Sequence, residues 1–185
     1  MDLGNDANAG STGSLHGPVV RGDSLRLRRP LVGPQFGVFV PSDARVRARF
    51  GSKWTNFGFG LGPVRAPRRG GAWSADFSFL SNRRTAEAGQ GSALVVPFGA
   101  EYRIALGEPT GPWRPYAGGT AGGVAAWLSD PETATRVNGR LAPSAGGFVG
   151  IAFGERAYVE VHGYRFGSTG GWSAGGWNIA AGFRF

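Results

Sequence analysis

Ionisable side chains interrupt several otherwise apolar runs of this sequence, and they do so at alternate positions. Glu101 and Arg103 lie two residues apart, as do Glu160 and His162. Side chains two positions apart on a β-strand point to the same face, so each pair shares one side of its strand. The complete set of titratable residues expected on this polar face is Asp76, Glu101, Arg103, Glu160, His162 and Arg184.

These residue types could support either ion pairing or chemistry. Two arginines against three carboxylates favour a salt-bridge network, because a buried charge without a partner is strongly destabilising. A gated polar path along the same face is a second interpretation, and catalysis is a third. With two His and no Cys, the chain shows no metal-ligand motif, and no glycine-rich segment has the Lys and Ser/Thr of a phosphate-binding loop. The sequence therefore predicts no catalytic, metal-binding or cofactor-binding residues.

The segments that carry these residues alternate in polarity with a period of two. In the last run, 174–185, Ile179 and Phe183 belong to a set of large apolar side chains. The other set is glycine, alanine, Asn178 and Arg184. A soluble strand would bury its apolar face, but here the polar face is small enough for a crowded interior and the apolar face carries rings that suit lipid. This is the alternation of a transmembrane β-strand, apolar outside and polar inside.

Eight such runs follow one another through the chain, and eight strands form the smallest common membrane barrel, whose interior is filled by side chains. The sequence therefore predicts an all-β, eight-stranded antiparallel up-and-down transmembrane β-barrel. The expected strands cover 33–40, 53–62, 72–82, 92–106, 113–128, 141–154, 157–166 and 174–185. The side chains expected to face lipid include Phe57, Phe59, Phe77, Phe79, Ile179 and Phe183.

The connections between these runs alternate in length. Longer polar loops are expected at 41–52, 83–91 and 129–140, and turns at 63–71, 107–112 and 154–156, of which 63–71 is as long as the 83–91 loop. Short periplasmic turns and longer outer loops are typical of membrane barrels. Within the first loop, Ser42 or Asp43 could cap a short helical turn that ends at Phe50.

Composition limits the other classes of protein. The chain has 185 residues, 34 of them Gly, and no stretch approaches the roughly 20 apolar residues of a membrane helix. The absence of Cys excludes a disulfide framework. The net charge of +8 arises almost wholly from arginines scattered over turns, which argues against a nucleic-acid partner because the clustered basic surface of such proteins is missing.

Residues 1–30 differ from the rest of the chain. They are rich in Gly, Asn, Asp and Ser, and then in Arg, and they lack the apolar core of a secretory signal. They also offer too little apolar surface to pack. The sequence predicts a flexible N-terminal leader over 1–30, without a recognisable signal peptide, and one barrel domain over 31–185.

Four segments resemble the small eight-stranded outer-membrane β-barrel proteins of the OmpA/OmpW-like kind. They are GVFVPSDARVRARFGSKWTNFGFGLG, WRPYAGGTAGG, AYVEVHGYRF and the terminal FRF. The resemblance covers 31–185 and implies an integral protein of the bacterial outer membrane, a monomer in contact with outer-membrane lipid. It also implies insertion by the barrel assembly machinery, with the C-terminal Phe185 as part of the signal that this machinery recognises.

The expected function follows from this resemblance: a non-enzymatic envelope protein with a structural or surface role, or a narrow passive conduit for small apolar molecules. One alternative is a soluble lipocalin-like barrel that binds a small ligand. That fold needs an apolar interior, but Asp76 and Glu101 belong to the set of side chains expected to face inward. Another is a hydrolase that modifies lipid A. Enzymes of that kind use a His-x-Ser spacing, and because residue 164 is Tyr, His162 lacks its nucleophile.

Overall fold

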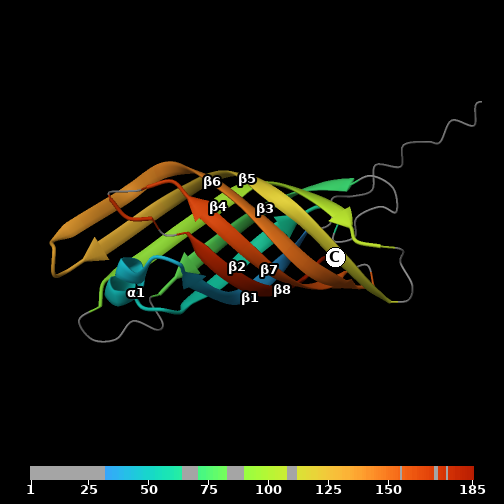
Figure 1. Cartoon of the computed structure of the whole chain (residues 1–185), viewed down its shortest axis with the longest axis horizontal. Helices are drawn as coiled ribbons and strands as arrows, with labels where there is room; N and C mark the ends of the chain where they lie inside the picture. The colour runs from blue at the N-terminus through green and yellow to red at the C-terminus, as the bar shows by residue number, and fades with distance from the viewer. Residues whose placement is uncertain are drawn as a thin grey trace, which may run out of the picture.

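Eight antiparallel strands close into a barrel in the computed structural model of the chain (Figure 1). The structure describes residues 32–63, 71–82, 90–107, 112–154, 156–168, 171–173 and 175–185. The strands are β1 (Val32–Pro41), β2 (Trp54–Leu61), β3 (Gly71–Ser81), β4 (Ser92–Ala105), β5 (Trp113–Asp130), β6 (Thr135–Phe153), β7 (Ala157–Phe166) and β8 (Gly176–Phe183), with one helix, α1 (Ala44–Phe50), between β1 and β2. The predicted fold class is therefore confirmed.

Each strand pairs with the next one along the chain, and the first pairs with the last. In the closing pair, Phe36 lies opposite Ala181 and Val40 opposite Trp177. The backbones of Val32 and Phe185 exchange two further hydrogen bonds of 3.3 and 3.0 Å. The end of the barrel that holds these terminal residues is called the terminal end below, and the opposite end, which holds α1, the loop end. The expected leader, 1–30, lies outside the described residues.

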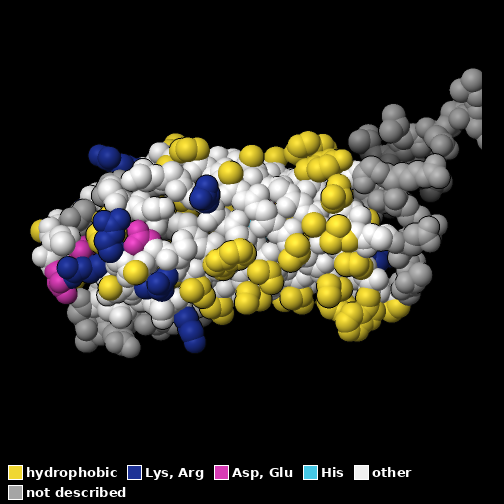
Figure 2. Space-filling view, viewed as in Figure 1, with side chains coloured by type: hydrophobic (Ala, Val, Ile, Leu, Met, Phe, Trp, Pro, Cys, Tyr) yellow, Lys and Arg dark blue, Asp and Glu magenta, His cyan; other side chains and the backbone are white. Residues whose placement is uncertain are grey.

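The strands place their large apolar side chains outside. In β8, Ile179 is 59% exposed whereas its neighbour Asn178 is 2% exposed. The same arrangement, with large apolar side chains outside and polar ones inside, recurs around the barrel. Figure 2 shows apolar side chains over the middle and the terminal end, while charged ones gather at the loop end. Exposed members of this apolar belt include Phe36, Phe57, Phe59, Trp73, Phe77, Phe98, Trp113, Val149, Trp177, Ile179 and Phe183. Phe79 is also on the outer face and is partly exposed. A surface of this kind suits hydrocarbon rather than water.

No helix in the described parts of the chain has the length and apolar character to cross a membrane. The helix that is present, α1, covers the loop end of the barrel. It begins after Asp43, whose carboxylate accepts the backbone N–H of Arg45 at 2.8 Å, as an N-cap does. Its apolar residues Val46 and Phe50 are buried, and the indole N–H of Trp54 donates to the carbonyl of Phe50 at 3.0 Å. The predicted capped helical turn is therefore present at the predicted place.

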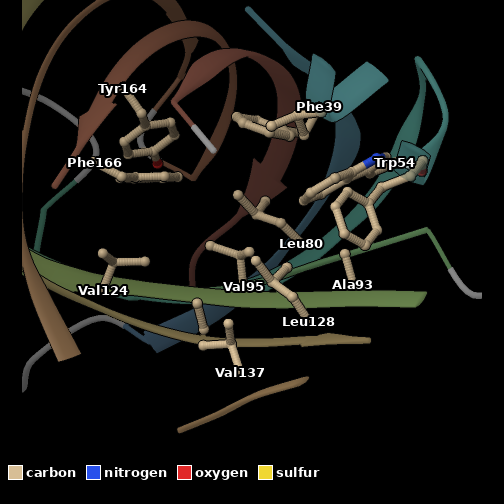
Figure 3. Packing of buried hydrophobic residues seen from close by; sticks show 13 residues of the cluster. Phe39, Trp54, Leu80, Ala93, Val95, Val124, Leu128, Val137, Tyr164 and Phe166 are labelled. Carbon is tan, nitrogen blue, oxygen red and sulfur yellow. Dashed lines mark hydrogen bonds between the residues drawn. The ribbon is translucent and has the colours of Figure 1, made fainter. Parts of the chain in front are cut away.

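Beneath α1, the interior of the loop-end half is apolar. Side chains from seven strands and the helix pack there without exposure, and Figure 3 shows them pointing toward one another inside the barrel. Phe39 lies at its centre, with ring centroids 5.6 Å from Trp54 and 6.3 Å from Phe166. This apolar plug comprises Phe39, Val46, Phe50, Trp54, Leu80, Ala93, Val95, Val124, Ala126, Leu128, Val137, Tyr164 and Phe166.

The connection between β5 and β6 differs from the prediction. The sequence predicts a polar loop over 129–140, but the strands continue to Asp130 and restart at Thr135, so the turn spans only 131–134. The resulting hairpin projects beyond the rest of the barrel (Figure 1). The carboxylate of Asp130 holds the turn by accepting from the backbone N–H of Glu132 at 3.1 Å and the hydroxyl of Thr133 at 2.8 Å. Glu132 also forms an ion pair with Arg49 of α1.

Candidate functional site

The interior of the terminal half is polar, and its centre is the guanidinium of Arg103. Arg103 and Glu101, which share the inner face of β4, approach to 2.6 Å. Glu160 reaches the same guanidinium nitrogen from β7, at 3.4 Å. All three side chains are buried, with 1% to 4% of their surface exposed. One arginine thus serves two carboxylates in a space without water access, where pairing is required for stability.

Aromatic rings and hydroxyl groups complete the surroundings of this ion cluster. The centre of the Arg103 guanidinium lies 5.2 Å from the ring centroids of both Tyr116 and Phe148, within cation–π range. The Tyr116 hydroxyl donates to Glu160 at 3.0 Å, and the Ser74 hydroxyl donates to Glu101 at 3.0 Å. The carboxylates therefore bind both a cation and neutral donors.

His162 extends the cluster toward the middle of the barrel. Its Nδ1 lies 3.3 Å from an oxygen of Glu160, and its ring stacks on Tyr164 with centroids 4.3 Å apart. Glu101, Glu160 and His162 each bring one potential metal-ligand atom within 4.8 Å of the others. Because Arg103 contacts both carboxylates, its positive charge already occupies the position that a metal ion would need.

Asp76 belongs to a second, neutral group of partners. Gln35 donates to its carboxylate at 2.6 Å, and the Ser78 hydroxyl donates to it at 3.2 Å. The hydroxyl of Tyr158 in turn donates to the carbonyl oxygen of Gln35 at 2.9 Å. Of the three carboxylates predicted as possible arginine partners, Asp76 has none among the described residues, because amide and hydroxyl groups of β1 and β3 occupy its oxygens.

Arg184 is the second correction. The sequence predicts that it pairs with Asp76, Glu101 or Glu160, but in the described structure its guanidinium makes no ion pair and its three nitrogens have no hydrogen-bond partner. The side chain is completely buried. It lies against the backbone of Gly60, where the missing side chain leaves room, and its charge is 5.3 Å from the ring centroid of Tyr158. It shares the interior with the acids but does not reach them.

The structure therefore brings Glu101, Arg103, Glu160 and His162 together and keeps Asp76 and Arg184 apart from them. Sequence reasoning did not single out the neutral partners Gln35, Ser74, Tyr116 and Tyr158. A signal for the tyrosines exists, since Tyr116 lies over Gly150 and Tyr158 over Gly182, both glycines on a neighbouring strand. This pairing of Tyr with Gly across neighbouring strands can be recognised only when the strand register is known.

The chemistry available to this interior is limited. Among the described residues, no Ser or Thr hydrogen bond reaches His162. The His162 ring packs between the rings of Phe148 and Tyr164. Toward the loop end the polar groups give way to the apolar plug. The described interior thus consists of a charge cluster in the terminal half and an apolar plug in the loop-end half.

The closed strand order, the apolar belt and the polar interior define a membrane-spanning β-barrel. No protein-family model matches the chain, and no curated protein does. Among solved structures, the crystal structure of Neisserial surface protein A (NspA) is similar, with 13% identity over 84% of this chain and 94% of that chain and a TM-score of 0.59. The crystal structure of Ail, the attachment invasion locus protein of Yersinia pestis, gives 15% identity, 84% and 97% coverage and a TM-score of 0.45. The likeness to NspA supports the fold, a closed eight-stranded β-barrel.

Proposed function

We propose that this chain is an integral, non-enzymatic β-barrel of the bacterial outer membrane with a structural or surface role. The observation that carries the proposal is the combination of a lipid-compatible outer belt with an interior that buried side chains occupy in both halves of the described barrel. Aromatic rings on the outer face would lie in the bilayer. An exposed apolar surface of this extent marks contact with a membrane or another protein rather than with water, and its extension over all eight strands favours the membrane.

The barrel is expected to insert with its terminal end in the periplasm and its loop end outside. Short periplasmic turns and longer outer elements support this orientation. The end of β6 at Phe153 and the start of β7 at Ala157 lie at the terminal end, whereas α1 and the β5–β6 hairpin lie at the loop end. Phe185 then lies beside Val32 at the periplasmic rim, and its role as an assembly signal remains part of this proposal.

The filled interior supports a structural role over a passive conduit. A small apolar solute would have to pass both the apolar plug and the ion cluster around Arg103. Both are packed, and moving the cluster would separate buried charges. We therefore expect the monomeric barrel to show little steady conductance.

Two measurements test the proposal. The refolded protein should partition into detergent and lipid vesicles and migrate faster in SDS gels before heating than after it, as a closed barrel does. In planar bilayers it should leave the membrane resistance nearly unchanged. A protein that folds in water without detergent would contradict the membrane assignment, and steady ion or solute passage through the wild-type barrel would favour the conduit instead.

A further inference from the structure

A groove crosses the outer wall of the barrel where β6, β7 and β8 meet, with a volume of about 490 Å³. It lies toward the loop end, because its lining includes Ser42 at the end of β1 and Gly176 at the start of β8. Across its floor, Gly147 pairs with Gly163, and Gly163 pairs with Trp177. The groove is therefore part of the surface that a bilayer would cover.

The groove exists because outward positions that carry large side chains elsewhere are bare here. On β6, Val149 is exposed as part of the belt, whereas Ala145 and Gly147 offer little beyond backbone. A side chain built on Gly147 would meet nothing closer than the carbonyl oxygen of Gly118, at 3.6 Å, so the space above it is open. The ring of Trp177 lies over Gly163, 3.1 Å from where a side chain would begin, and forms one wall.

The loop end of the groove is positively charged. Arg165, which pairs with Ala145 across the strands, lines the groove and is exposed. A second guanidinium, that of Arg47, donates to the carbonyls of Pro41 at 2.8 Å and Ser42 at 2.6 Å, directly beside it. No acidic residue is among those lining the groove in the described part of the chain.

An outward arginine on an apolar wall needs an anion. Arg165 lies toward the loop end, near the expected bilayer surface, where a basic residue attracts anionic lipid. An uncharged acyl chain alone would leave Arg165 unpaired. A second copy of the barrel could also use the bare backbone for close approach, but a two-fold contact would bring two copies of Arg165 into one interface without an acid from the groove to pair them.

We propose that this groove binds one phosphorylated lipid, with an acyl chain along Ala145, Gly147 and Gly163 against Trp177, and the phosphate at Arg165. The proposal rests on the proposed function, because only an inserted barrel presents this wall to lipid. It adds a defined lipid site to a surface otherwise covered by exchanging lipid.

Native mass spectrometry of the barrel released from nanodiscs tests the proposal. The nanodiscs contain equal amounts of phosphatidylglycerol and phosphatidylcholine, and the retained lipid is identified by mass. The wild type should retain one phosphatidylglycerol, with at least a fivefold preference over phosphatidylcholine. Arg165→Gln should lose the preference, and Gly147→Val, whose added Cβ would have a clearance of 3.6 Å, should lose retention of both lipids.

Matched controls separate the groove from the rest of the wall. Ala100→Val enlarges an exposed outward side chain of β4, and neither Ala100 nor its cross-strand partners Ala75 and Ala121 line the groove. Arg140→Gln removes an exposed arginine that lies on β6, outside the groove. Both should retain lipid as the wild type does, and equal loss in the controls and the groove variants would overturn the proposal.

Insertion is measured separately by heat-dependent gel mobility in the same nanodiscs. A barrel that fails to insert contradicts the proposed function. A barrel that inserts but retains no phosphatidylglycerol overturns the groove alone. Masses of a lipid-free dimer that disappear in Gly147→Val would assign the groove to a second copy of the chain instead.

Discussion

Two buried arginines occupy this interior in opposite electrostatic situations. Arg103 lies against Glu101 and Glu160, whereas Arg184 has no acid or hydrogen-bond acceptor among its described neighbours. Their sequence contexts are alike, since each alternates with apolar residues near the terminal end of its strand. Only the structure separates them, and it predicts opposite effects of replacing them.

Replacing Arg103 should destabilise the barrel. In Arg103→Met, Glu101 and Glu160 would remain buried without their cation, and breaking a buried pair in this way costs about 3–5 kcal/mol. The free energy of unfolding is measured by urea denaturation in lipid vesicles, with tryptophan fluorescence as the signal. Arg140→Met, at an exposed site, is the control and should unfold as the wild type does. If Arg103→Met has the wild-type free energy, the cluster is solvated and the description of the interior is wrong.

Replacing Arg184 should stabilise the barrel. Its guanidinium is buried without partners, so Arg184→Met keeps the side-chain length and removes the penalty of unsatisfied polar groups, about 1–3 kcal/mol. The same urea titration measures the change. A loss of stability in Arg184→Met would show that this charge finds an anion or water in the folded protein.

At the scale of elements, the alternation of side chains predicts the strands well where both faces have a fixed environment. In β8, the lipid outside favours Ile179 on the outer face, and the crowded polar interior favours Asn178 on the inner face. The 129–140 segment was predicted as a loop because Arg136, Gly139 and Arg140 have the composition of one. Beyond the bilayer both faces of a hairpin can be polar, so alternation is no longer required there and the strands cannot be recognised by it.

The interior contacts were predictable in type but not in pairing. A period of two places Glu101, Arg103 and Glu160 on inner faces. Which of them meet depends on the stagger between strands around the closed barrel, which the facing pattern does not contain. The same limitation explains why the pairing of Asp76 with Gln35 was not predicted, since it joins β3 to β1 across β2.

The stability of α1 should depend on pH through its cap. The backbone N–H of Arg45, with its side chain in support, holds the pKa of the Asp43 carboxyl below its ordinary value. A lowered folded-state pKa means that the cap stabilises the helix above the ordinary value and loses this effect as the pH falls through the folded value, below about pH 4. Amide exchange of Arg45 and Val46, corrected for the intrinsic rate, should therefore lose protection in that range.

The matched variant is Asp43→Asn, which can still accept the hydrogen bond but carries no charge. Its protection at Arg45 should not change over the same pH range, and neither should that of Asn178 in either protein. Equal pH dependence in the variant and the wild type would mean that another group controls the end of α1.

At the scale of the whole molecule, the two halves of the interior differ, while the outer belt has exposed apolar side chains on every strand. An ion cluster occupies the terminal half and an apolar plug the loop-end half, and on the face shown in Figure 2 most charged side chains lie at the loop end. The belt alone then decides where the molecule can reside. Its energetic contribution can be measured one position at a time along a single strand.

A charge placed on this belt should cost more toward the middle of the bilayer than at its edge. Phe77 lies at the centre of β3 and Trp73 near its terminal end, and both are exposed on the outer face. For Phe77→Arg we expect a loss of about 2–4 kcal/mol in the free energy of unfolding, and for Trp73→Arg about 0–1 kcal/mol. Phe77→Leu and Trp73→Leu, measured by the same urea titration in vesicles, separate the effect of charge from the loss of the ring. In detergent micelles, which adapt to the protein, the difference between the two arginine variants should shrink. Equal losses at the two positions in vesicles would mean that β3 does not cross the hydrocarbon region with its centre at Phe77, and the belt would then have to be placed elsewhere along the barrel.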